Sequence, residues 1–384
     1  MVNLPTLHSI LKEYGIISTS VFTRFKTLYK SLTVNVLIKI FERIFELQVR
    51  SKFEELSNKH SSCLSRELVT VVLDDSIFKQ WLSALSSEGV RENFDSCYAC
   101  FFSGQFKSNV YGFKNCCIGV VIDKVYYPLY FEYIPKQKKA ETDEYSVQVA
   151  TAIKLVERFG FFNETLKAES IDLGNLKLSV DNGYSDMALA KICEIHNLTY
   201  ISVPKKSHTF LINGQKIKLS EWIKTAFSRL EKEYNLEQEK LPIEKREPFV
   251  HRFKGFYRSK NKSVVLLAFR LNGSKKVSII YTTAKDEKSK TLRRHWFQRT
   301  YIEHFFKILK HVLEIQESRT RDKNSFSFKF LRFAFMAFHV QQLIRFIRKK
   351  MKNWSNKGFI SIQRVIRRND DFYDLLQKLI YDIY

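Results

Sequence analysis

The sequence predicts an α/β fold in which helices flank a mixed β-sheet. Three observations predict it. Short runs rich in Val, Leu and Tyr are bounded by turn residues, one segment follows the order strand, turn, helix, strand, and 45% of the 384 residues are hydrophobic. A chain of this length is expected to form two or three structural units, each with a sizeable core.

The first half of the chain begins with predicted helices and continues with strands. Residues 1–66 are predicted to form several helices, including a basic amphipathic run. A buried strand is predicted in 67–76, "ELVTVVLDDS", and is expected to end at Asp74 and Asp75. Two further strands, joined by a tight Asp-Lys turn, are predicted in 115–135.

Helices and strands then alternate. A helix is predicted in 141–160, with acidic residues in its first turn and Gly160 at its end. Residues 176–204, "LKLSVDNGYSDMALAKICEIHNLTYISVP", predict a βαβ unit whose strands pair in parallel. Asp181 follows the first strand of this unit, just before the "NGY" turn. In a mixed sheet, the first predicted strand can lie beside this one, which would bring Asp74 close to Asp181.

The second half of the chain is less regular. Residues 205–292 are predicted to form a β-rich insertion with one helix near 219–235. Within it, "SVVLLAFRLNGSKKVSIIYTT" contains an Asn-Gly pair that is typical of a β-hairpin. Residues 293–352 return to helix, and a basic tail, 353–384, closes the chain.

The net charge of +24 and pI near 9.6 favour a polyanionic partner, most simply nucleic acid, over an anionic membrane surface. The apolar run at 328–347 is interrupted by basic residues, so it predicts a core helix rather than a bilayer crossing. With no leader-like segment at the N-terminus, we expect a soluble, intracellular protein. The six cysteines lack clear zinc spacing, so free thiols are expected and no zinc is assigned.

The segment "HWFQRTYIEHFFKILK", 295–310, carries the most informative pattern. On a helix, Trp296, Arg299, Glu303 and Lys310 fall within an arc of about 60°, while apolar residues occupy the other side. Such a stripe is either a solvated face, with Glu303 paired to Lys307, or one wall of an active site. With Asp74 and Asp181 it would complete a set of three carboxylates, the ligands that two Mg²⁺ ions need.

These motifs resemble a known family. The order strand-Asp, strand-Asp, helix-Glu resembles the RNase H-like fold of DDE transposases and integrases. W-x2-R-x3-E-x6-K at 296–310 resembles the Y-x2-R-x3-E-x6-K signature of bacterial cut-and-paste transposases of the insertion-sequence family numbered four. The resemblance implies an RNase H-like core in two parts, 67–204 and 293–352, interrupted by the insertion at 205–292.

The resemblance also implies roles for individual residues. Asp74, Asp181 and Glu303 would hold two Mg²⁺ ions, with Mn²⁺ able to substitute, and would be the catalytic residues. Arg299 and Lys310 would grip DNA backbone phosphates. Trp296 stands where the family has tyrosine, so a hydrogen bond from a phenol is lost there, although an indole can still pack on DNA. Asp75 remains open as an alternative first ligand.

The implied function is metal-dependent cleavage at transposon ends followed by strand transfer into target DNA. The expected partners are double-stranded DNA and a second copy of the chain, which would form a homodimer on DNA in the cytoplasm, in association with the bacterial nucleoid. Residues 1–66 would contribute to recognition of the ends. Two alternatives remain: an RNase H-like nuclease without strand transfer, and a catalytically inactive DNA-binding protein descended from a transposase.

Overall fold

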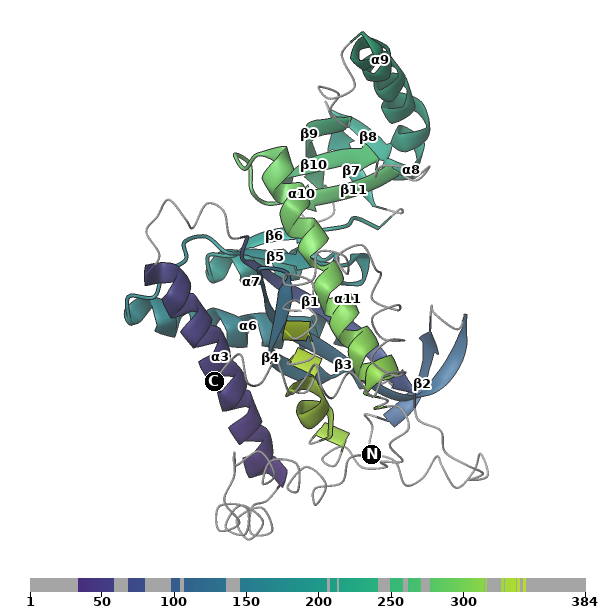
Figure 1. Cartoon of the computed structure of the whole chain (residues 1–384). Helices are drawn as coiled ribbons and strands as arrows, with labels where there is room; N and C mark the ends of the chain where they lie inside the picture. The colour runs from purple at the N-terminus through teal and green to yellow at the C-terminus, as the bar shows by residue number, and fades with distance from the viewer. Residues whose placement is uncertain are drawn as a thin grey trace, which may run out of the picture.

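A computed structural model gives the fold of much of the chain (Figure 1). It describes residues 34–58, 68–79, 98–103, 107–135, 146–205, 208–212, 214–240, 249–257, 262–270 and 277–313, with short pieces between 315 and 342. The predictions for 1–33 and 353–384 lie outside the described residues, as does the turn of the hairpin predicted around the Asn-Gly pair.

The strands of the described residues form one mixed sheet. In the first part of the chain they are β1 (Thr70–Lys79), β2 (Tyr98–Ser103), β3 (Ser108–Ile122), β4 (Val125–Tyr133), β5 (Lys177–Val180) and β6 (Thr199–Ser202). In the second part they are β7 (Thr209–Ile212), β8 (Gln215–Lys218), β9 (Val250–Tyr257), β10 (Lys262–Arg270) and β11 (Val277–Thr282). Their order across the sheet is β2-β3-β1-β5-β6-β11-β10-β9-β7-β8, and β4 pairs with β3.

Strand β1 lies at the centre of the first part of the sheet. It pairs antiparallel with β3 and parallel with β5. This confirms the prediction that the first strand can lie beside the first strand of the βαβ unit. The expectation that this strand ends at the two acids was wrong, because pairing with β3 continues as far as Lys79. The parallel pairing with β5 does stop at Leu73 and Val180, so Asp74 and Asp181 each follow the last paired residue of their strand.

The turn between β3 and β4 confirms the predicted tight Asp-Lys connection. Asp123 and Lys124 both have positive φ, 48° and 66°. Two central residues with positive φ make a turn whose twist matches the right-handed twist of the flanking strands.

Helices cover both faces of this part of the sheet. They are α3 (Val34–Asn58), α6 (Val147–Ala168), α7 (Met187–Ile195), α10 (Ser289–Gln298) and α11 (Thr300–Lys307). Side chains alternate along β1: Val71 and Leu73 share a core with α6 and α7, and Val72 and Phe78 share a core with α11. Figure 1 shows α10 and α11 running one after the other across the sheet, with α3 beside α6.

Helix α6 differs from the prediction at both ends. Its N-cap is Ser146, whose Oγ accepts a hydrogen bond from the Val149 amide at 3.3 Å, and its first turn contains no acid. The helix also continues past Gly160 to Ala168. Gly160 instead marks a close approach between helices, since a Cβ there would lie 2.2 Å from Cγ of His196.

The segment between β6 and α10 extends the same sheet. Strand β11 pairs antiparallel with β6, and β10 pairs with β11 as the predicted hairpin requires. The predicted helix near 219–235 is present as α8 (Leu219–Trp222), a π-helical turn at Ile223–Phe227 and α9 (Ser228–Glu239). Arg270 of β10 ties this helix to the sheet through both carboxylate oxygens of Glu231, at 2.8 and 2.7 Å.

The described pieces of the apolar run near the C-terminus belong to the core, as predicted. Phe326, Phe330, Leu331 and Ala334 are buried in the same cluster as Phe78. Among the helices that the structure describes, none is long and apolar enough to cross a membrane.

Candidate active site

The three acids that the sequence singled out meet around one guanidinium group. Arg299 Nη1 lies 3.3 Å from Asp74 Oδ2 and 2.8 Å from Glu303 Oε1. Its Nη2 lies 3.9 Å from Asp181 Oδ1. The three carboxylates come from β1, from the turn after β5 and from α11, so the fold brings together residues that are far apart in the chain.

The Asp74 carboxylate is the most buried of the three, with 15% of its side chain exposed. Burial and, to a smaller extent, the negative charge of Asp75 raise the pKa of Asp74 to about 7, although the Arg299 guanidinium opposes both effects. A carboxylate whose pKa is shifted by burial and by neighbouring charges is typical of a functional site.

Asp75 points to the opposite face of β1. Its Oδ2 accepts hydrogen bonds from Gln148 Nε2 at 2.8 Å and from the Tyr184 hydroxyl at 2.5 Å, and its Oδ1 lies 3.3 Å from Lys114 Nζ. Neighbouring residues of a strand face opposite sides of a sheet, so only one of the two aspartates can join Glu303. In this geometry that residue is Asp74.

Asp181 lies at the start of a short 3₁₀ turn, Asn182–Tyr184. Its side chain makes no capping hydrogen bond, whereas its backbone oxygen accepts from the Tyr184 amide at 3.0 Å. The turn is therefore closed by the backbone, and the carboxylate, 42% exposed, is left to face Arg299.

The helix that carries Arg299 and Glu303 is interrupted at two points. Helix α10 ends at Gln298 and α11 begins at Thr300, so Arg299 lies at the junction. A π-helical turn follows at Ile308–Val312 and contains Lys310. The four residues of the predicted stripe thus lie on two helices and a π-helical turn rather than on one regular α-helix.

The two ends of the stripe contact apolar rings. Lys310 Nζ lies 5.4 Å from the centre of the Phe78 ring. Burial lowers the pKa of Lys310 to about 8, against the opposing effect of Asp75 and Asp74. Trp296 packs edge to face on Phe269 with ring centres 5.6 Å apart, and its buried Nε1 has no hydrogen-bond partner among the described residues.

The donor set fits a divalent cation in chemistry but not in its present arrangement. Among the described residues, no group of three or more Asp, Glu, His or Cys side chains stands close enough to hold a metal ion. The Arg299 guanidinium occupies the space between the carboxylates and acts as the cation there. Three carboxylates against one guanidinium leave an excess of negative charge, and carboxylate oxygens are the ligands that Mg²⁺ prefers.

Sequence reasoning did not identify Lys114 and Gln148 as parts of this region. Neither residue stands out in the sequence, and each reaches Asp75 only because β3 and α6 pack beside β1. Tyr184 lies in the quoted "DNGY" turn, but its hydrogen bond to Asp75 could be found only from the fold. Cys116, Cys117 and Cys193 are buried free thiols.

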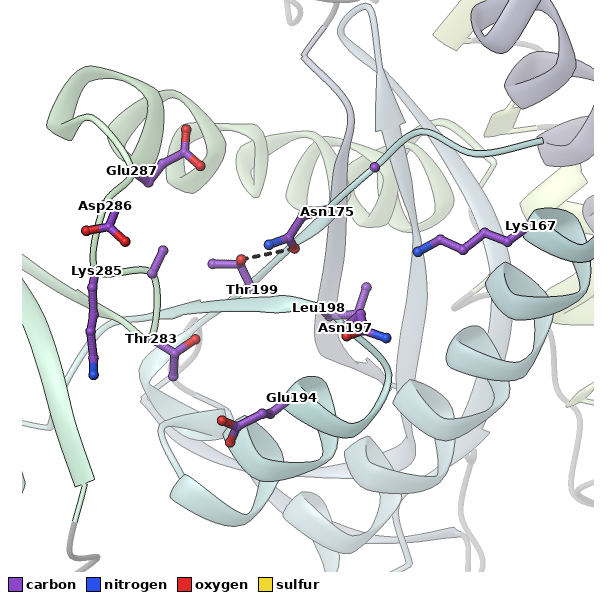
Figure 2. A pocket seen from close by; sticks show the side chains of 12 residues that line it. Lys167, Asn175, Glu194, Asn197, Leu198, Thr199, Thr283, Lys285, Asp286 and Glu287 are labelled. Atoms are coloured by element: carbon purple, nitrogen blue, oxygen red, sulfur yellow. Dashed lines mark hydrogen bonds between the residues drawn. The ribbon is translucent and has the colours of Figure 1, made fainter. Parts of the chain in front are cut away.

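A cavity of about 640 Å³ lies elsewhere, near the beginning of β5 and β6 (Figure 2). Its lining includes Asn175, whose Oδ1 accepts a hydrogen bond from Thr199 Oγ1 at 3.1 Å. Asp181 follows the other end of β5, so this cavity is separate from the carboxylate site.

Comparison with known proteins gives one match that bears on function. Residues 161–338 match the family model of the transposase DDE domain. This match supports a DDE transposase. It includes Asp181, Arg299 and Glu303 and begins after Asp74, so the place of Asp74 in the site depends on the geometry described above.

The other comparisons are weaker. No curated protein sequence matches the chain. Two crystal structures of endonuclease V from Ciona intestinalis are similar to it, one in complex with a 24mer DNA containing an inosine followed by a ribo-adenosine, the other a single-residue variant in complex with a 23mer of the same kind. The first is 17% identical and covers 65% of this chain and 86% of its own. The second is 15% identical and covers 73% of this chain and 95% of its own. Both have a TM-score of 0.29, too low to carry an argument.

Proposed function

We propose that this protein is a DDE transposase that cleaves DNA at the ends of a transposon and joins those ends to target DNA. The observation that carries the proposal is the convergence of Asp74, Asp181 and Glu303 on Arg299. The match of 161–338 to the transposase DDE domain supports it. A net charge of +24 fits a DNA substrate, since Lys and Arg side chains neutralise phosphates.

The proposal includes an RNase H-like catalytic core. The strand order β4-β3-β1-β5-β6, with β1 parallel to β5 and β5 parallel to β6, supports that fold. In such a core, the first acid lies on the central strand, the second follows its parallel neighbour, and a helix across the sheet supplies the third. Insertion of strands β7–β11 between the second and third acids agrees with a core divided into two parts.

Asp74, Asp181 and Glu303 are the residues that would hold two Mg²⁺ ions, and Mn²⁺ would substitute. When bound, these ions would activate the attacking oxygen and neutralise the leaving oxygen of the phosphodiester. The protein supplies the burial of Asp74, which strengthens its interaction with any cation, and a rigid strand and helix that fix the direction of each carboxylate.

The reaction has two stages at the same carboxylates. Water first attacks a phosphodiester at the transposon end, which breaks one P–O bond and frees a 3′-hydroxyl. That hydroxyl then attacks a phosphodiester of the target, and one P–O bond forms as another breaks. Because the number of phosphodiester bonds is conserved in the second stage, joining needs no external energy source.

Arg299 and Lys310 are proposed to bind backbone phosphates beside the cleaved bond. A guanidinium can present two parallel N–H groups to a phosphate. When cations enter the site, Arg299 would therefore release the carboxylates and bind a DNA phosphate. Trp296 would pack against DNA near the same point. Residues 1–66 would help to recognise the ends, and two copies of the chain would act as a homodimer on DNA in the cytoplasm.

The test uses a supercoiled plasmid that carries the gene with its native flanking DNA, incubated with purified protein and Mg²⁺. Breaks at two fixed flanking positions, lost in Glu303→Gln and on chelation, are the expected result, together with insertion products. Breaks without joined products would favour a nuclease that does not transfer strands. If wild type and Glu303→Gln bind DNA equally and neither produces breaks, the result would favour a catalytically inactive DNA-binding protein descended from a transposase.

A further inference from the structure

A hydrogen bond links strand β1 to the turn that carries Asp181. The Tyr184 hydroxyl, on a side chain that is only 1% exposed, donates to Asp75 Oδ2 at 2.5 Å. The Tyr184 amide donates to the Asp181 carbonyl at 3.0 Å and closes the same turn. Tyr184, which makes this contact with Asp75, is therefore only three residues along the chain from Asp181, the second acid of the site.

The Asp75 carboxylate is itself held from two other elements. Gln148 Nε2 of α6 donates to it at 2.8 Å, and Lys114 Nζ of β3 lies 3.3 Å from it. Lys114 Nζ also donates to Gln148 Oε1 at 3.2 Å, so the three side chains form a closed network. A buried polar network with its members satisfied is rigid. Asp75 is thus a fixed point against which the turn can be positioned.

Helix α6 also packs directly on the turn. A Cβ at Gly183 would lie 2.8 Å from Gln148 Nε2, so a side chain there would displace the end of Gln148 from the network. On the side of β6, the Tyr200 hydroxyl donates to the Tyr184 carbonyl at 2.6 Å. Tyr184 is accordingly held at its carbonyl by β6 and at its hydroxyl by β1.

We propose that Asp75 is a positioning residue of the candidate active site, which acts through the Tyr184 hydroxyl to set where Asp181 stands relative to Asp74. The inference rests on the proposed function. The two adjacent aspartates of β1 have different roles because their side chains lie on opposite faces of the sheet. Asp74 faces the site of the reacting phosphodiester, and Asp75 holds the turn that carries Asp181. Side chains that orient metal ligands typically change metal affinity about 10–100-fold when they are removed.

Four variants separate this role from others, each measured for equilibrium Mn²⁺ binding without DNA and for its rate of DNA cleavage. Asp75→Ala and Tyr184→Phe remove the link and should weaken Mn²⁺ binding about 10-fold or more. Asp75→Asn keeps an oxygen that can accept the hydrogen bonds from Gln148 and Tyr184, although its NH2 group then faces Lys114 Nζ, so it should weaken Mn²⁺ binding less than Asp75→Ala does. Asp74→Asn removes a proposed ligand and should abolish cleavage.

Tyr133→Phe is the matched control for the loss of a buried hydroxyl. The Tyr133 hydroxyl is bonded to Ser327 Oγ at 2.9 Å, and its ring lies in the core on the α11 side of the sheet, away from the turn. Thermal unfolding should show similar losses of stability for Tyr133→Phe and Tyr184→Phe, while only Tyr184→Phe loses Mn²⁺ affinity. If Asp75→Ala does not fold, Tyr184→Phe still carries the test, because it retains the buried ring.

Two results would overturn the inference while the proposed function stands. One is a Tyr184→Phe protein that binds Mn²⁺ as well as Tyr133→Phe does. The other is an Asp75→Asn protein that is as inactive as Asp74→Asn, which would make Asp75 a ligand rather than a positioning residue. A wild-type protein that neither binds Mn²⁺ nor cleaves DNA would overturn the proposed function and the inference with it.

Discussion

Asp74 and Arg299 are 225 positions apart in the chain and form an ion pair at 3.3 Å. Their side chains are 15% and 14% exposed, so water screens the pair little. Arg299 also reaches Glu303, one turn along its own helix, at 2.8 Å. A single guanidinium thus holds together a strand acid and a helix acid, and we expect it to compete with any metal ion for both.

Arg299→Gln tests this competition. Without the guanidinium the carboxylates repel one another and the buried Asp74 loses its partner, so the metal-free variant should be less stable by about 1–3 kcal/mol. Mn²⁺ should bind more tightly than to wild type, because no internal cation has to leave first. Urea unfolding and calorimetric titration with Mn²⁺ measure the two effects.

Arg270→Gln provides the control for that experiment. It breaks the pair between Arg270 of β10 and Glu231 of α9, and β5, β6 and β11 separate β10 from β1 in the sheet. It should lose stability without any change in Mn²⁺ affinity. Weaker Mn²⁺ binding by Arg299→Gln would contradict the competition and show that Arg299 arranges the carboxylates for the metal.

Asp74→Asn should stabilise the metal-free protein at neutral pH. Burial raises the pKa of Asp74 from 3.8 to about 7, so between these values the folded state binds more protons than the unfolded state. Stability therefore falls as pH rises through this range. The variant removes that loss and should be more stable than wild type at pH 7.5 by about one to a few kcal/mol.

Near pH 3 the two proteins should unfold at nearly the same temperature, since Asp74 is then protonated in both the folded and the unfolded state. Thermal unfolding at both pH values makes the comparison. A variant that is less stable than wild type at pH 7.5 would show that the ion pair with Arg299 outweighs the cost of burial.

How much of the site could be predicted differs from residue to residue. The position of Asp181 directly after a strand can be predicted, because a strand followed by a turn and a helix is a local pattern in the sequence. The end of β1 was misjudged because two acids look like a strand end, while the pairing of Asp75 with Cys116 of β3 is a non-local contact that keeps the strand going.

The helix of Glu303 shows a second limit. A regular period of 3.6 residues predicts that Trp296 and Lys310 share one narrow stripe, but the break at Arg299 and the π-helical turn at Ile308–Val312 alter that period. Packing against the aromatic rings of Phe269 and Phe78 involves other parts of the chain, so no local pattern reveals it.

His295 should make the protein sensitive to acid. Its Nδ1 lies 2.7 Å from Thr70 Oγ1 in the core, and burial lowers the pKa of His295 to about 3. Below the ordinary pKa near 6.5 the unfolded state takes up a proton that the folded state does not, so the free energy of unfolding decreases as the pH is lowered. Between pH 6.5 and 5 the loss from this group should be about 2 kcal/mol. In urea unfolding at several pH values, the stability of wild type relative to His295→Gln should decrease by this amount from pH 6.5 to 5, because the opposite contribution of Asp74 is common to both proteins.

Lys310→Met tests whether Lys310 binds DNA, as proposed, or only packs against the core. The methionine side chain can still cover Phe78, and removing a partly buried charge whose pKa is lowered to about 8 should leave the protein as stable as wild type or slightly more stable. Affinity for transposon-end DNA should fall, and the slope of log affinity against log salt should decrease by about one. Lys307→Met is the matched control, because Lys307 is exposed on the same helix one turn earlier. A variant that unfolds, or that binds end DNA with the wild-type salt slope, would make Lys310 a residue of the core and remove it from the proposed interface.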